Sequence, residues 1–167
     1  MSETSLTPSR LWKGMSLAQR TAAAGAFWSD EQATDDQVQA VMLIAQQKKF
    51  RPKTVFGLDL DRKARHLATV TALPDPLAAR VLIIYHLSAQ RPMMGAFLDA
   101  LGIAHENGLI QDDGVKPEAA RLGPAARHLA EQFPAADVSL YFNTLICQDP
   151  ATWGGLAQEL GSLKSEV

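Results

Sequence analysis

The chain of 167 residues is long enough for one domain, or for two small helical lobes that share a core. Its 47% hydrophobic and 20% charged residues are ordinary proportions for a globular protein, and they exclude extensive disorder away from the ends. The net charge of −2 weighs against a nucleic-acid binder, which usually carries a clearly basic domain. The single cysteine, Cys147, excludes an internal disulfide framework, and its apolar neighbours predict a buried side chain.

The sequence carries no recognisable targeting signal. The first twenty-five residues lack a positive start followed by an apolar core, and no stretch is long and apolar enough to cross a membrane. We also find no lipidation motif. These observations predict a soluble cytoplasmic protein that does not use a membrane as a partner.

The spacing of apolar residues predicts an all-α fold, a compact array of about seven to nine helices. Flexible tails are expected at 1–8 and 162–167, with a single all-helical domain over 9–161 between them. Residues 9–60 are a candidate N-terminal lobe of that domain.

Caps and periodicity mark the first helices. A helix is expected to begin near Pro8, and Ser16 is a suitable N-cap for a second helix that ends at about Trp28. Residues 36–48 are predicted to form an amphipathic helix, because apolar side chains recur at helical spacing, at Val38, Val41, Met42 and Ala45.

The chain is organised around a helix that begins at Asp75. Pro76 costs no hydrogen bond in the first helical turn, and Asp75 before it can cap the free amides. The helix is apolar nearly all round, since its only strongly polar side chains between residues 77 and 89 are Arg80, His86 and Ser88. Such a helix is predicted to lie in the core, with amphipathic helices packed around it.

The second half is predicted to be helical as well, apart from one long loop. A helix that follows Pro92 is expected to end at Gly102, which fits a C-terminal glycine cap. Residues 103–117 contain Asn107-Gly108 and Asp113-Gly114 and are expected to form the longest loop, without a strand pair. The remaining helices are expected at 117–133, at 136–148 and from Pro150 onward.

Residues 64–102 and 126–161 resemble each other and suggest an internal repeat. Ala64-Arg65-His66-Leu67-Ala68 recurs as Ala126-Arg127-His128-Leu129-Ala130, and each copy leads through a proline into an apolar helix with a tyrosine. Alanine-rich helical sequences also produce such matches by chance. If the repeat is real, two or three degenerate helix-pair units stack on one another, the third and faintest toward the N-terminus.

The sequence holds no signature of catalysis, of a cofactor or of a metal site. No helix turn presents two histidine ligands, because at least nineteen residues separate any two of His66, His86, His105 and His128. The start of a helix explains Asp35-Asp36, and Asp112-Asp113 lacks the alternating oxygen ligands of a calcium loop. We therefore predict no catalytic residue, cofactor or metal, and we lean toward a protein that is not an enzyme.

A basic stretch over 48–66 is the one feature that points to a partner. It carries seven lysines and arginines against two aspartates, whereas residues 99–167 carry ten acidic residues against four basic ones. This asymmetry can mark a face that binds anions, or two faces that meet. Phe50 and Phe56 within the stretch are side chains on which nucleic-acid bases stack. The candidate partner-binding residues are Lys48, Lys49, Arg51, Lys53, Arg62, Lys63 and Arg65.

We therefore predict a helical protein-interaction module, such as an adaptor, a regulatory subunit or an inhibitor of another protein. Its partner is expected to be a protein with an acidic surface, and a homodimer in which the acidic half covers the basic stretch is an alternative. A nucleic-acid-binding regulator is the second class, with a helix–turn–helix drawn from Val38 to Val70. An enzyme or small-molecule binder, with a pocket that one sequence does not reveal, is the third.

Overall fold

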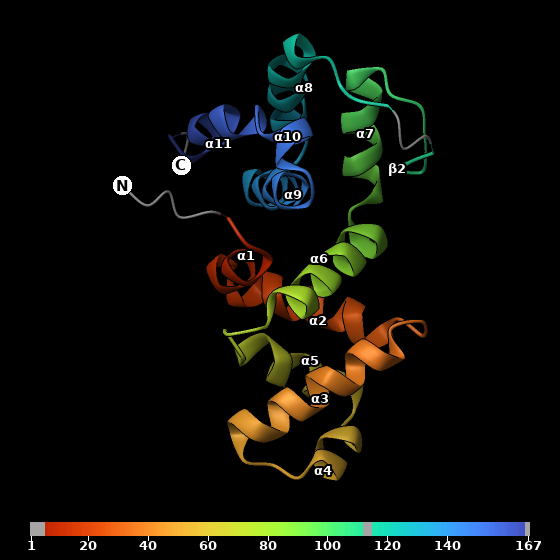
Figure 1. Ribbon diagram of the computed structural model, residues 1–167, viewed down its shortest axis with the longest axis vertical. Coiled ribbons are helices and arrows are strands. Elements are labelled where there is room, and N and C mark those ends of the chain that lie inside the picture. The colour runs from red at the N-terminus through yellow and green to blue at the C-terminus, as the bar shows by residue number, and fades with distance from the viewer. Residues whose placement is uncertain (1–5, 112–114, 166–167) are drawn as a thin grey trace. The chain divides into compact units, whose positions relative to one another are not determined.

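The computed structural model describes residues 6–111 and 115–165. Within these residues it contains eleven helices and one pair of two-residue strands, so the predicted all-α fold is confirmed (Figure 1). The helices outnumber the expected about seven to nine because two of them are single turns. These two are α4 (Pro52–Phe56) and α10 (Pro150–Trp153).

The contacts divide the chain into two compact units, one of residues Thr7–Ala89 and one that begins at Gln90. The boundary lies directly after the helix that begins at Asp75. Whether the two units act as the single domain expected over 9–161, and whether 9–60 is a lobe of it, stays a prediction.

The N-terminal unit is built on α2, which packs against α5 and α6, while α1 packs on α6 and α3 contacts α4, α5 and α6 (Figure 1). The expected cap of α2 is present, because the Ser16 hydroxyl accepts a hydrogen bond from the backbone of Gln19, and Asp59 caps α5 in the same way. Besides α4, the helices of this unit are α1 (Pro8–Gly14), α2 (Leu17–Ser29), α3 (Thr34–Lys48), α5 (Leu60–Thr69) and α6 (Asp75–Ala89).

The helix α6 is the core helix that its sequence predicts. Leu77, Leu82 and Ile84 are among its buried side chains, and Val81 has no exposed surface. Asp75 has a role that its sequence context does not predict. Its carboxylate accepts a hydrogen bond of 3.0 Å from the backbone N–H of Ser9, which ties the start of α6 to α1.

The C-terminal unit is centred on aromatic side chains. The ring of Phe97 lies 4.9 Å from that of Phe142, 5.7 Å from that of Tyr141 and 6.1 Å from that of Trp153, centroid to centroid. These rings join α7 to α9 and α10, while α8 packs against α7 and α11. Besides α10, the helices of this unit are α7 (Arg91–Leu101), α8 (Ala119–Gln132), α9 (Ala135–Gln148) and α11 (Leu156–Ser165).

The expectation that residues 103–117 contain no strand pair is wrong. Strand β1 (His105–Glu106) pairs antiparallel with β2 (Leu109–Ile110). The two residues between them, Asn107 and Gly108, have φ angles of 53° and 90°. Two successive residues with positive φ make the turn that matches strand twist, for which Asn-Gly is the preferred sequence. Asp112-Asp113 and the adjoining Gly114 lie outside the described residues.

The internal repeat is not confirmed. Both segments run from the end of one helix into a long apolar helix and then into a helix that starts with or next to proline. In segment 64–102, however, the third helix α7 belongs to the C-terminal unit and packs on α8. In segment 126–161, α10 and α11 both pack on the preceding helix α9.

Candidate partner-binding surface

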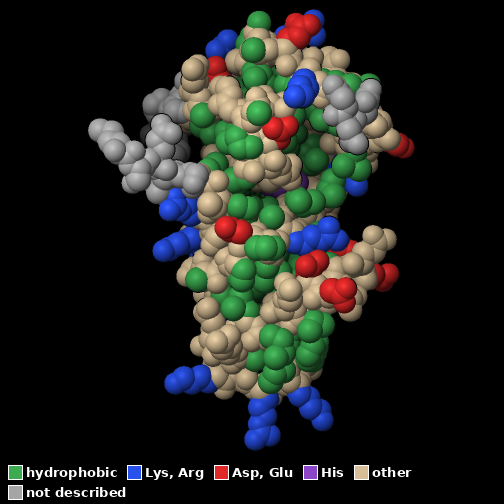
Figure 2. Space-filling model, viewed as in Figure 1, with side chains coloured by type: hydrophobic (Ala, Val, Ile, Leu, Met, Phe, Trp, Pro, Cys, Tyr) green, Lys and Arg blue, Asp and Glu red, His purple; other side chains and the backbone are tan. Residues whose placement is uncertain are grey.

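The basic stretch occupies the end of α3, all of α4 and most of α5. Lys48 is the last residue of α3, and Lys49 after it adopts a left-handed conformation with φ of 59°, which ends the helix. Cations are favoured at this end of a helix by its dipole. Figure 2 shows Lys and Arg side chains projecting around the end of the N-terminal unit at which Figure 1 places α4.

Three of the seven candidate cations form what we call the basic end, namely Lys49, Arg51 and Lys53. All three side chains are exposed. None of them has an ion-pair partner in the part of the chain that the structure describes. No carboxylate among the described residues therefore pairs with these three charges.

Three further cations, Lys48, Arg62 and Arg65, have partners close by. The Lys48 ammonium donates a hydrogen bond to the Thr69 hydroxyl and so joins the end of α3 to the end of α5. On α5, Arg62 Nε lies 3.8 Å from Asp59 Oδ2, and Arg65 Nη2 lies 2.9 Å from Asp61 Oδ2. Both acidic partners are on or beside the same helix, so these arginines add little net charge to the surface.

These three cations converge on His66. The Phe50 ring packs edge-on against the imidazole, with centroids 5.4 Å apart. Burial lowers the pKa of His66, and the charges of Lys48, Arg65 and Arg62 lower it further.

Lys63 lies apart from the other six candidates. Its ammonium sits 5.5 Å from the ring centroid of Trp28 on α2, as a cation–π contact. Lys63 therefore contributes to the packing of α5 on α2.

Large apolar side chains are exposed among these charges. Phe56 is 48% exposed and Leu60 is 49% exposed, while Phe50 retains 39% exposure beside His66. The sequence singled out the two phenylalanines but not Leu60, which has the appearance of a core residue at a helix start. Exposed apolar groups surrounded by charge are a common feature of binding surfaces.

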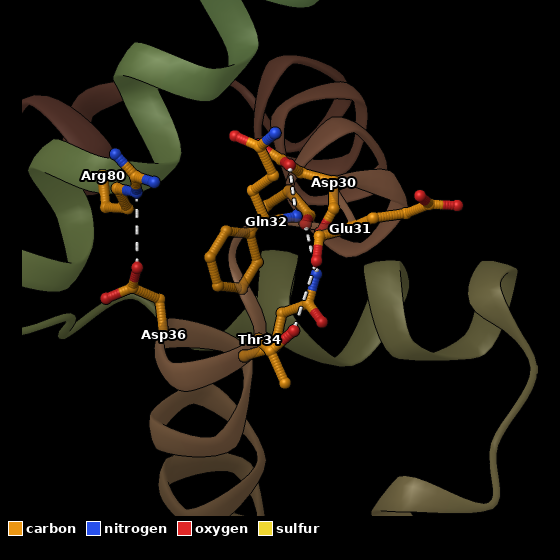
Figure 3. A network of polar contacts seen from close by, with 8 residues as sticks. Asp30, Glu31, Gln32, Thr34, Asp36 and Arg80 are labelled. Carbon is orange, nitrogen blue, oxygen red and sulfur yellow. Dashed lines mark hydrogen bonds and ion pairs between the residues drawn. The ribbon is translucent and has the colours of Figure 1, made fainter.

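Acidic residues gather at the opposite end of α3, where a turn leads into it from α2. The Asp30 carboxylate accepts a hydrogen bond of 2.9 Å from the backbone of Gln32, and Asp36 forms an ion pair of 3.3 Å with Arg80 of α6 (Figure 3). The hydrogen bond lies within the turn, and the ion pair joins the start of α3 to α6. The helix therefore carries acidic side chains at its start and basic ones at its end.

A groove of about 440 Å³ runs beside α3. The helix predicted over 36–48 is present, but its four periodic apolar residues do not share one environment, because Val41 and Ala45 are buried whereas Val38 is 42% and Met42 is 52% exposed. The lining contains no titratable side chain, so the groove offers no acid–base or metal chemistry. It is formed by Val38, Gln39, Met42, Leu43, Gln46, Pro74, Pro76 and Leu77.

The histidines that have polar contacts hold the fold together. His105 Nε2 lies 2.7 Å from the Asp99 carboxylate, and its Nδ1 accepts a hydrogen bond of 3.0 Å from the backbone of Gly108, which fastens the hairpin to α7. His86 is buried in α6 with Nδ1 2.7 Å from the carbonyl oxygen of Leu82. Over the described ranges, no three His, Cys, Asp or Glu side chains gather as a metal site.

No family model, no curated protein and no solved structure matches this chain. Among the helices that the structure describes, none combines the length and the apolar character needed to cross a bilayer.

Proposed function

We propose that this chain is a cytoplasmic protein-interaction module that binds an acidic partner protein through its basic end and has no catalysis of its own. Adaptors, regulatory subunits and inhibitors are the classes of protein that work in this way. The observation that carries the proposal is the group of exposed cations Lys49, Arg51 and Lys53, which have no ion pair among the described residues, next to the exposed Phe56.

An acidic protein surface suits this end for two physical reasons. Like charges that gather without internal partners repel one another, and an acidic surface relieves the repulsion while it steers the encounter. Phe56 and Leu60 supply apolar area that is covered only when a partner docks. Arginine and aromatic side chains are also the residue types that contribute most to binding at interfaces.

A nucleic-acid-binding regulator is the second candidate, favoured by the exposed ring of Phe56 among lysines and arginines. The helix that would enter a groove in the helix–turn–helix interpretation is α5, whose apolar face packs on α2. Its exposed face presents Asp61 as well as Arg62 and Arg65. A carboxylate there repels the phosphate backbone, so we rank this candidate below a protein partner.

The test is affinity purification of the tagged full chain from its native host, followed by mass spectrometry. The double variant Arg51→Glu/Lys53→Glu should no longer capture the specific partner. The control variant Lys13→Glu/Lys116→Glu replaces two exposed lysines elsewhere, changes the net charge by the same amount, and should still capture it. Equal capture by both variants would contradict the proposal. Capture that nuclease treatment abolishes would instead favour the nucleic-acid candidate.

A further inference from the structure

The outer face of α3 combines apolar and charged side chains in a symmetrical order. We use this name for Asp35, Val38, Gln39, Met42 and Gln46 of the helix together with Lys49, the residue that caps its end. Val38 and Met42 lie one helical turn apart in its middle, and both are about half exposed, at 42% and 52%. The two glutamines are exposed on either side of them. Figure 2 shows hydrophobic side chains gathered over α3 on the side toward the viewer.

The groove beside this face gives it a shape that another side chain can enter. Pro74, Pro76 and Leu77 form its far wall, at the start of α6. The Asp36–Arg80 ion pair holds α3 against α6 (Figure 3). A wall of proline rings is stiff, so the groove is largely formed before anything binds.

The charges on this face are antisymmetric about Met42. Asp35 lies seven residues before it and Lys49 seven residues after it. Seven residues are close to two helical turns, so Asp35 lies on the same side of α3 as the methionine, and Lys49 is the left-handed residue that caps the far end of the helix. Both side chains are exposed, and neither has an ion pair within the described part of the chain. The neighbouring Lys48 instead bonds Thr69.

We propose that a second copy of this chain covers the outer face of α3, with the two α3 helices antiparallel about a two-fold axis at Met42. This arrangement places Asp35 of each copy opposite Lys49 of the other, so that two equal ion pairs flank the apolar centre. A parallel arrangement would set like charges against each other. A two-fold interface requires a patch that complements itself, and the antisymmetric charge order of α3 meets that requirement.

The interface formed in this way is small. The fifteen residues of α3 extend over about 22 Å, and one helix face with its groove covers less than the about 800 Å² per partner of a standard interface. The dimer is therefore weak and depends on protein concentration. It forms without the proposed acidic partner, with which it shares only Lys49.

Sedimentation velocity of the full chain, from about 5 µM to about 500 µM, tests this inference in the range where weak dimers dissociate. The wild type should shift from monomer to dimer, and Met42→Asp should stay monomeric with unchanged helical circular dichroism because the side chain is exposed. Leu17→Asp, at an exposed apolar side chain on α2, should dimerise like the wild type.

A charge swap decides between this geometry and any other dimer. Lys49→Asp alone should weaken dimerisation about tenfold, because both symmetrical pairs turn repulsive. Asp35→Lys together with Lys49→Asp should restore it to the wild-type level. Three results would each overturn the inference. They are a wild type that stays monomeric at every concentration, a Met42→Asp variant that still dimerises, and a charge swap that fails to restore the dimer.

Discussion

The indole nitrogen of Trp12 donates a hydrogen bond of 2.7 Å to the carbonyl oxygen of Val70, and so joins two residues 58 positions apart in the sequence. Val70 ends α5, where a backbone carbonyl has no partner within its own helix. Arg20 of α2 completes the arrangement with a hydrogen bond of 2.8 Å to the carbonyl oxygen of Ala68. Side chains from the first two helices therefore cap α5 and close the N-terminal unit.

Replacing Trp12 with phenylalanine should destabilise the protein by about 1–3 kcal/mol, since a buried acceptor loses its donor. The free energy of unfolding from urea titration measures this change. Leu17→Ala serves as a control at an exposed position and should change stability by less than about 0.5 kcal/mol. Equal stability of Trp12→Phe and the wild type would show that the hydrogen bond contributes nothing.

The core position of α6 is tested with Leu82→Asp. Only 1% of this side chain is exposed, and an unpaired buried carboxylate costs several kcal/mol, about the whole stability of a small domain. The variant should fail to fold into a soluble form. Ser88→Asp, on the exposed side near the end of the same helix, should melt within a few degrees of the wild type. A cooperative, wild-type-like melt of Leu82→Asp would contradict the assignment of α6 to the core.

Stability should fall as the pH is lowered from about 7.5 to about 5.5, around the ordinary histidine pKa. Burial lowers the pKa of His86, and burial with nearby cations lowers that of His66. The unfolded chain therefore binds protons at a higher pH than the folded chain does. The stability that these neutral histidines contribute is fully present above the unfolded-state pKa and is lost progressively as the pH falls toward the lower folded-state pKa.

His86→Phe should flatten this pH dependence, because the ring is kept and the titrating group is removed. Urea titrations at several pH values give the slope for each protein. An unchanged slope in the variant would mean that protonation of His86 is not linked to unfolding.

Substitution by alanine should have opposite effects on stability at two glycines, one in the hairpin turn and one inside α2. Gly108 has φ of 90°, and an added Cβ would come within 3.0 Å of Met94 Cβ and 3.2 Å of the Arg91 carbonyl oxygen, so Gly108→Ala should destabilise by about 1–3 kcal/mol. Gly25 lies inside α2 with nothing within 4 Å of such a Cβ, so Gly25→Ala should stabilise by about 0.5–1 kcal/mol. Thermal melting compares the two, and a stabilising Gly108→Ala would refute the described turn.

Most of the helices could be predicted from the sequence because their signals are local. Ser16 and Asp59 sit where they cap α2 and α5, and the apolar run after Asp75 marks α6. The hairpin was missed since two-residue strands carry almost no periodicity, although Asn107-Gly108 is a direct hairpin signal. The boundary between the two units depends on long-range packing, which no local pattern encodes.

The candidate surface was predictable in composition but not in geometry. A list of cations does not reveal that Lys63 packs over Trp28, or that Arg62 and Arg65 are balanced by neighbouring aspartates. The groove beside α3 was missed for a related reason. Periodicity assigns Val38 and Met42 to the same face as Val41 and does not tell which of them a neighbouring helix covers.

Binding of fluorescent poly-L-glutamate, followed by anisotropy, tests the central claim on a defined acidic polypeptide. The wild type should bind, and its affinity should fall steeply between about 50 and 300 mM salt. Arg51→Glu with Lys53→Glu should weaken binding at least about tenfold, while Lys13→Glu with Lys116→Glu should leave it within about twofold. An affinity that changes neither with the salt concentration nor with the charge reversal at Arg51 and Lys53 would contradict the claim that the basic end binds an acidic partner.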